Sequence, residues 1–114
     1  MNSEMIKGYI DAIILSVLAR GDTYGYEIAK QVTEQTAELF ELKEGTLYPA
    51  LKRLEANGLI EGYYPTGQKD SRRRRYYTIT DLGRKRLEES KLSWQQNIRV
   101  IGKFLGGSAG WNNG

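Results

Sequence analysis

The centre of the chain reads GTLYPALKRLEANGLI from Gly45 to Ile60, and this stretch decides the fold. Four apolar residues recur at the i, i+3, i+4, i+7 spacing of one helix face: Leu47, Ala50, Leu51 and Leu54. The opposite face carries hydroxyls and cations: Thr46, Tyr48, Lys52 and Arg53. Asn57 and Gly58 tolerate the left-handed conformation that ends helices. A helix with an apolar back and a basic, hydroxyl-rich front is typical of one that lies in a DNA groove.

Pro49 sets the expected start of this helix. Proline lacks the backbone N–H and clashes with the carbonyl four residues earlier, so it is tolerated only near the first turn. We therefore expect the helix to begin near Gly45 or Thr46, with its DNA-reading residues in the first turn and a half.

Composition limits the classes of function. The chain has 114 residues, 39% of them hydrophobic, so a single domain is expected. It contains neither cysteine nor histidine, which removes disulfides, the usual metal ligands and the commonest general base. We expect no metal and no cofactor. No stretch has the roughly 18 apolar residues of a membrane span, and the N-terminus lacks a signal peptide's basic start, so a cytoplasmic protein without membrane contact is expected.

Positive charge is concentrated around the central helix and in the segment that follows it. The formal net charge is +3, but residues 43–86 hold eleven Lys/Arg against five Asp/Glu, a local charge of +6. The remainder has six basic and nine acidic residues, a charge of −3. This asymmetry favours a polyanionic partner, and a merely solvated basic face is the alternative.

Two helices are expected before the central one. Residues 4–19 carry an amphipathic line, and Tyr9 and Leu15 lie off it, which indicates a second apolar face for a partner subunit. Asp22 and Thr23 offer N-cap chemistry for a helix over about residues 24–36, whose Gly25 permits close helix approach. Residues 39–42 are expected to form a short extended segment. The order of three helices with a basic third one is that of a helix-turn-helix.

A hairpin and a long helix follow. Residues 59–64 and 72–79 read as two strands around a Pro/Gly loop, and they form a wing with a cationic outer half. Its four consecutive arginines alternate sides, so they are either phosphate contacts or a charged edge that guards against aggregation. Thr80-Asp81 caps a helix to about Leu105. Its heptad-like seam predicts pairing with a second copy, together with the first helix, and Leu92, Val100 and Phe104 form a second strip.

These patterns predict a mainly helical α+β protein. It consists of a winged helix-turn-helix DNA-binding domain over residues 1–80, a C-terminal dimerisation helix over 81–105 and a disordered tail over 106–114.

The motif from Gly45 to Glu55 with Gly58-Leu59-Ile60 closely resembles the signature of PadR-type transcriptional regulators. The resemblance extends to Tyr24-Gly25-Tyr26-Glu27-Ile28 and to the stretch from Tyr76 to Gly83. It implies a winged-helix homodimer that represses transcription. Lys43-Glu44 stands where the family often has Ser-Pro, and Ser71-Arg72-Arg73 where it often has Gly-Arg-Pro. The single terminal helix is similar to that of the family's compact branch. Some members of this branch bind flat aromatic or amphipathic compounds at the dimer interface through a tryptophan, a role the resemblance implies for Trp94. Packing in the interface is the alternative.

Three sets of site residues follow, and the expected partners are double-stranded DNA, a second copy and a planar aromatic effector. The DNA-binding set is Tyr24, Tyr26, Lys43, Gly45, Thr46, Tyr48, Lys52, Arg53, Lys69, Arg72, Arg73 and Arg74. The effector set is Tyr9, Ile13, Trp94 and Ile98. The dimer set is Ile6, Ile10, Leu87, Trp94, Ile98, Ile101 and Leu105. A winged-helix module for protein interaction or non-specific DNA binding, without an effector, is the alternative function. An enzyme is disfavoured because the sequence lacks His, Cys, a phosphate-binding glycine loop and paired carboxylates near a basic cleft.

Overall fold

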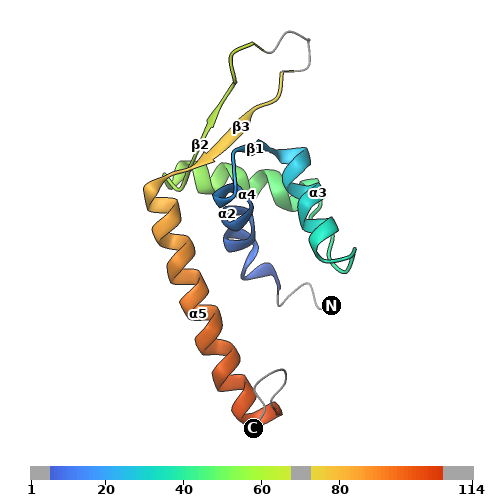
Figure 1. Ribbon diagram of the computed structural model, residues 1–114, viewed down its shortest axis with the longest axis vertical. Coiled ribbons are helices and arrows are strands. Elements are labelled where there is room, and N and C mark those ends of the chain that lie inside the picture. Colours follow the sequence, from blue (N-terminus) through green and yellow to red (C-terminus); the bar gives the residue numbers. More distant parts are fainter. Residues whose placement is uncertain (1–5, 68–72, 107–114) are drawn as a thin grey trace.

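A small antiparallel sheet and a long projecting helix flank three shorter helices in the computed structural model, which describes residues 6–67 and 73–106 (Figure 1). The elements are α2 (Ile10–Ala19), β1 (Thr23–Tyr24), α3 (Gly25–Gln35), α4 (Glu44–Ala56), β2 (Ile60–Tyr63), β3 (Tyr76–Ile79) and α5 (Asp81–Leu105). The sheet order is β1-β3-β2. This arrangement confirms the predicted mainly helical fold with a winged helix-turn-helix and a long terminal helix.

Helix α2 is the centre of the core. It packs against α3, α4, β3 and α5, and Ile14, Leu15 and Leu18 are at most 1% exposed. Leu15 was predicted to lie on a second face for a partner, but the chain itself covers it. The predicted helix over 4–19 is also interrupted: Gly8 and Tyr9 form a turn, with the Tyr9 N–H donating to the Ile6 carbonyl at 2.7 Å. Glycine at position 8 makes this break easy.

Helix α3 begins differently from the prediction. Its N-cap is Tyr24 in an extended conformation, without a side-chain cap. The predicted capping residues serve elsewhere: Thr23 is buried in β1, and the Asp22 carboxylate accepts a hydrogen bond from the Tyr63 hydroxyl at 2.6 Å. The two-residue strand β1 was not predicted, because only its pairing with Tyr76 and Tyr77 of β3 defines it.

Helix α4 confirms the predicted apolar stripe, since Leu47, Ala50, Leu51 and Leu54 are all buried. It begins at Glu44, one residue before the predicted start, and Pro49 lies just beyond the first turn within a continuous helix. Its C-terminus has the predicted glycine. Gly58 has φ +76°, its N–H donates to the Glu55 carbonyl, and the Leu59 N–H donates to the Leu54 carbonyl at 2.9 Å. This is a Schellman motif, and it turns the chain directly into β2.

The hairpin is shorter than predicted. Strands β2 and β3 pair antiparallel from Ile60↔Ile79 to Tyr63↔Tyr76, so Arg73, Arg74 and Arg75 precede β3 rather than belonging to it. Residues 39–42 form no strand, although Leu42 is buried.

Helix α5 begins at the corner between α4 and β2, packs along α2 with Leu87 in the core, and projects beyond the body of the molecule with its C-terminal part (Figure 1). As predicted, Thr80 caps it: the Thr80 hydroxyl accepts from the Gly83 N–H at 3.0 Å and donates to the Gly58 carbonyl at 2.7 Å. A Cβ on Gly83 would lie 2.1 Å from the Leu59 carbonyl oxygen, so only glycine permits this close approach. The helix ends at Leu105 as predicted, and residues 107–114 of the predicted tail lie outside the described residues.

Candidate nucleic-acid interface and neighbouring groove

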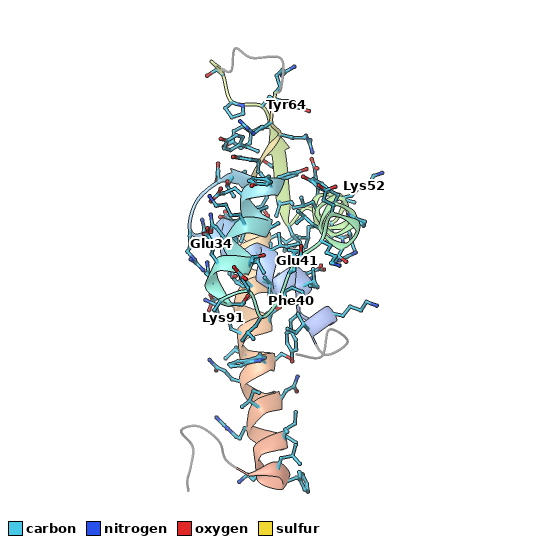
Figure 2. All side chains as sticks on the ribbon, turned by 90° about the vertical axis from the view of Figure 1, so that its right-hand side faces the viewer. Glu34, Phe40, Glu41, Lys52, Tyr64 and Lys91 are labelled. Carbon is cyan, nitrogen blue, oxygen red and sulfur yellow. The ribbon has the colours of Figure 1, made fainter. Side chains whose placement is uncertain are left out.

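The front of α4 is exposed. Lys43, Gly45, Thr46, Tyr48, Lys52 and Arg53 all face solvent, as expected from the burial of the opposite stripe. Figure 2 shows Lys52 on the outer side of the helix. Gly45 has open space around the position of a Cβ. The helix therefore presents a hydroxyl, a phenol and cations on its solvent-facing side.

Tyr48 connects this surface to α3. A Cβ on Gly25 would lie 2.6 Å from the Tyr48 hydroxyl oxygen, so the phenol ring lies directly on the glycine backbone. Partial burial, with smaller contributions from Glu44 and Tyr77, raises the pKa of Tyr48. The hydroxyl is protonated at neutral pH, as phenols ordinarily are, and can donate a hydrogen bond to a phosphate or a base edge. The prediction that Gly25 permits close helix approach is confirmed.

Arg53 is held by α2. Its Nη2 lies 2.5 Å from Asp11 Oδ1, and its Nε lies 3.5 Å from Oδ2. Hydrogen bonding to Asp11 raises the pKa of Arg53. The side chain is still half exposed. In this conformation Arg53 joins α4 to α2 instead of extending toward a ligand.

The base of the wing combines arginines with tyrosines. Arg73 lies over the Tyr64 ring at 4.2 Å, and Arg74 lies over the Tyr24 ring at 4.9 Å. Tyr24 in turn contacts Tyr76, with ring centroids 5.3 Å apart. Both arginines are exposed, and stacking on a ring restricts the orientation of a guanidinium. Lys69 and Arg72, also predicted to bind DNA, lie outside the described residues.

These contacts join the wing to α4. Arg74 lies on Tyr24, Tyr24 precedes Gly25, and Gly25 carries the Tyr48 ring. Tyr26, one residue further on, is 69% exposed. The contacts therefore connect three of the predicted DNA-binding residues, Arg74, Tyr24 and Tyr48, from the wing to α4. Sequence reasoning missed the role of Arg75, which turns inward to Glu55 of α4 at 2.6 Å.

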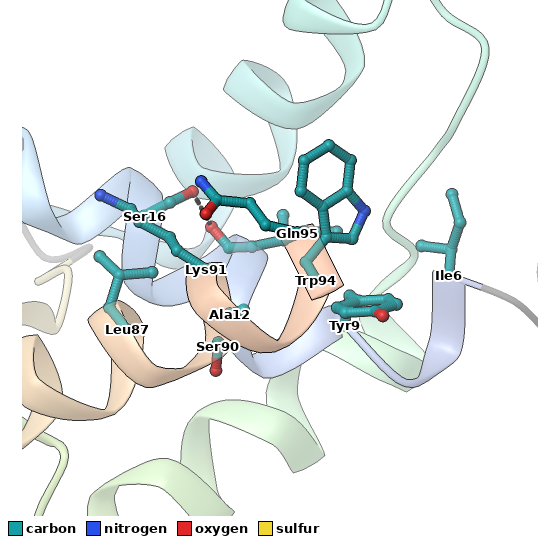
Figure 3. Close-up of a pocket in the computed structure, with 10 residues that line it drawn as sticks. Ile6, Tyr9, Ala12, Ser16, Leu87, Ser90, Lys91, Trp94 and Gln95 are labelled. Atoms are coloured by element: carbon teal, nitrogen blue, oxygen red, sulfur yellow. Dashed lines mark hydrogen bonds between the residues drawn. The ribbon is translucent and has the colours of Figure 1, made fainter. Parts of the chain in front are cut away.

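A groove of about 520 Å³ lies between residues 6–16, which include the first part of α2, and α5 (Figure 3). Tyr9 and Ile13 of the predicted effector set line it from one side and Trp94 from the other, whereas Ile98 is not among its lining residues. Trp94 is half exposed, and the Tyr9 hydroxyl accepts a hydrogen bond from the Asn97 amide at 2.9 Å. The walls are mostly apolar, with Lys91 as the charged side chain that lines them.

The predicted dimer residues divide into three groups by their exposure to solvent. Ile10 and Leu87 are 4% and 5% exposed and belong to the core of the protomer, which leaves little of them for a partner. Trp94, Ile101 and Leu105 are exposed on α5, while Ile6 and Ile98 are half buried. Leu92, Val100 and Phe104 add to the exposed apolar surface of the helix.

Helix-turn-helix, wing and basic exposed face together define a winged-helix DNA-binding protein. Residues 14–89 match the model of the transcriptional regulator PadR-like family, and the chain belongs to this family of DNA-binding transcriptional regulators. This confirms the resemblance described above. None of the helices in the described part of the chain is long and apolar enough to cross a membrane.

Solved structures and a curated relative agree with this assignment. A transcriptional regulator from Clostridium thermocellum has a TM-score of 0.84 and 46% identity, covering 90% of this chain and 98% of that one. A PadR family transcription regulator from Clostridium difficile has a TM-score of 0.75 and 49% identity, covering 86% and 99%. The negative transcriptional regulator PadR of Bacillus subtilis is 32% identical over 76 residues, which are 67% of this chain and 41% of that protein.

Proposed function

We propose that this chain is a homodimeric repressor that reads a roughly palindromic operator with α4. The observation that supports the proposal is the chain of contacts from Arg74 of the wing through Tyr24 and the start of α3 to Tyr48 on the exposed face of α4. Within it, Lys52 is suited to the acceptors of a guanine edge, and Thr46 and Tyr48 to phosphate oxygens. The wing arginines would grip the backbone or enter the minor groove.

The second copy is the partner that α5 fits best. Trp94, Ile98, Ile101 and Leu105 follow one another at intervals of 4, 3 and 4 residues, a seam whose spacing suits pairing with an identical helix, while Leu87 at the start of this line is covered by the protomer itself. The C-terminal part of the described helix projects beyond the protomer (Figure 1), and apolar side chains such as Phe104 are up to 83% exposed. A two-fold dimer built on this helix would place two copies of α4 against half-sites about one helical turn apart.

An effector would act through the groove next to this seam. Its Tyr9 and Trp94 rings suit a planar aromatic compound, and α5 forms both a wall of the groove and the proposed dimer contact. A compound that binds one spacing of the two α4 helices better than the other would release the operator. Quenching of Trp94 fluorescence by planar aromatic compounds, measured after Trp111 is replaced by phenylalanine, tests this step. No response across a chemically diverse panel would favour packing as the role of Trp94.

Footprinting and competition binding test the proposal as a whole. Purified protein is footprinted on the DNA upstream of its own gene, and the protected sequence then competes against random DNA of equal length. A preference of about a thousandfold or more for the protected sequence supports a specific repressor. Equal affinity would instead indicate a non-specific DNA-binding module. Sedimentation measurements on the same preparation establish whether the species that binds is a dimer.

A further inference from the structure

Glu55 and Arg75 form a bidentate ion pair between α4, the proposed recognition helix, and the wing. Arg75 Nη1 lies 2.6 Å from Glu55 Oε1, and Nη2 lies 2.8 Å from Oε2. Glu55 is in the last turn of α4, and Arg75 immediately precedes β3. Two parallel hydrogen bonds fix a guanidinium in direction as well as in distance, which a single contact does not.

Glu55 holds the other strand of the wing as well. The Gly62 N–H of β2 donates to Glu55 Oε2 at 3.3 Å. A Cβ on Gly62 would lie 2.3 Å from the Arg75 guanidinium, so the arginine occupies the space that a side chain would need. On its way to Glu55, Arg75 also lies over the Tyr77 ring at 5.5 Å. One carboxylate thus fastens both strands of the wing to the end of α4.

The pair is stable in its charged form. Hydrogen bonding to Arg75 lowers the pKa of Glu55, and hydrogen bonding to Glu55 raises the pKa of Arg75. Both side chains are about one third exposed. Ion pairs at this level of exposure contribute little to global stability, so the geometry of the pair is its more important property.

We propose that Glu55 and Arg75 are positioning residues that set the angle of the wing to the recognition helix. Arg73 and Arg74 are the two residues before Arg75, and an extended chain rises only about 3.3 Å per residue. Fixing Arg75 therefore fixes where the two stacked arginines meet the DNA backbone relative to Lys52 on α4. The inference rests on the proposed function, in which α4 and the wing contact one duplex.

Glu55→Gln separates this role from simple electrostatics. Removing a carboxylate near DNA should tighten binding through charge alone, whereas loss of wing positioning weakens it. Glu61→Gln is the matched control, because Glu61 is an exposed carboxylate on β2 and the charge change is identical. Gly62→Ala is a second variant that displaces Arg75 while leaving every charge in place.

The experiment is a double-mutant cycle with the wing variant Arg73→Ala/Arg74→Ala, measured as operator binding at several salt concentrations. In the wild type, this wing variant should lose four phosphate contacts per dimer and lower the salt slope by about 3 to 4. In Glu55→Gln and in Gly62→Ala the wing arginines should already contribute little, so the same change should lower the slope by about 1 or less. In Glu61→Gln the Arg73→Ala/Arg74→Ala change should lower the salt slope by as much as it does in the wild type.

Two results overturn the proposal, and they are distinguishable. If the wing variant lowers the slope as much in Glu55→Gln and Gly62→Ala as in the wild type, the positioning role fails and the DNA-binding role of the wing remains. If the wing variant changes nothing in the wild type, the proposed DNA contact of the wing fails, and the positioning role fails with it. The melting temperature of each variant should lie within a few degrees of that of the wild type. This control verifies that binding is compared between folded proteins.

Discussion

Gly83→Ala should destabilise the protein at the junction of α5 with the α4–β2 corner. The added Cβ would lie 2.1 Å from the Leu59 carbonyl oxygen and 2.8 Å from Ile79 Cγ1. Carbon–oxygen contacts normally begin at about 3.3 Å, so α5 and the Leu59 backbone would have to separate by about 1.2 Å. Leu59 is buried and its carbonyl accepts from the Thr80 N–H, so this backbone cannot move freely.

The expected loss of stability follows from three contributions. Overpacking of a close contact costs about 1–3 kcal/mol. Displacing Gly83 also weakens the hydrogen bond from its N–H to the Thr80 hydroxyl, and loss of such a cap costs about 1 kcal/mol. Alanine is favoured over glycine in a helix by about 1 kcal/mol, which offsets part of this. The net expectation is a free energy of unfolding lower by about 1–3 kcal/mol.

Urea unfolding followed by circular dichroism measures this difference, with all variants at one protomer concentration because dimer formation would couple to stability. Gly45→Ala is the control, since it is the same substitution in a helix where nothing lies within 4 Å of the added Cβ. It should be neutral or stabilising by up to about 1 kcal/mol. If Gly83→Ala is as stable as Gly45→Ala, the close approach of α5 to the Leu59 carbonyl is refuted.

Three further predictions concern charge, pH and assembly. Asp11→Asn should release Arg53 from its ion pair, which should raise operator affinity and steepen the salt dependence of binding. The free energy of unfolding should change by only about 1 kcal/mol or less. Unchanged operator binding would show that Arg53 does not contact DNA. Because the pKa of Glu55 is lowered, its stabilising effect should be complete above the unfolded pKa of about 4.3 and fade as the pH falls below it. The stability difference between wild type and Glu55→Gln should therefore vanish in acid, which a urea series across pH measures. Leu105→Ser should weaken dimerisation about tenfold or more in sedimentation experiments, whereas Leu82→Ser, exposed at the start of α5, should not.

Features encoded within a few neighbouring residues could be predicted from the sequence. The apolar stripe of α4, its end at Gly58 and the Thr80 cap of α5 each depend on residues within about two helical turns. The exposure of the predicted DNA-binding residues on α4 could be inferred from its apolar stripe, because a helix that buries one face exposes the opposite face to solvent. Trp94 of the groove was predictable from the family resemblance and the apolar spacing of the last helix, and Tyr9 from its position off the apolar line of the first helix.

Features that depend on distant residues could not be predicted. Strand β1 exists only through pairing with β3, more than fifty residues later. The pairing of Arg53 with Asp11 and of Arg75 with Glu55 requires the folded positions of α2, α4 and the wing. Four adjacent arginines look equivalent in the sequence. In the structure Arg75 pairs with Glu55, whereas Arg73 and Arg74 each lie over a tyrosine ring. The break at Gly8 was overlooked because the apolar line continues through it.

The anchorage of α5 at Thr80 and Gly83 makes this helix a lever. Its 25 residues extend for about 37 Å at 1.5 Å per residue. A rotation of about 5° at the anchored end then moves the far end by about 3 Å. In a dimer joined along α5, the same relation applies in reverse: a small change in the crossing of the paired helices turns each protomer's body and changes the distance between the two copies of α4. A junction this tight transmits such a rotation instead of absorbing it.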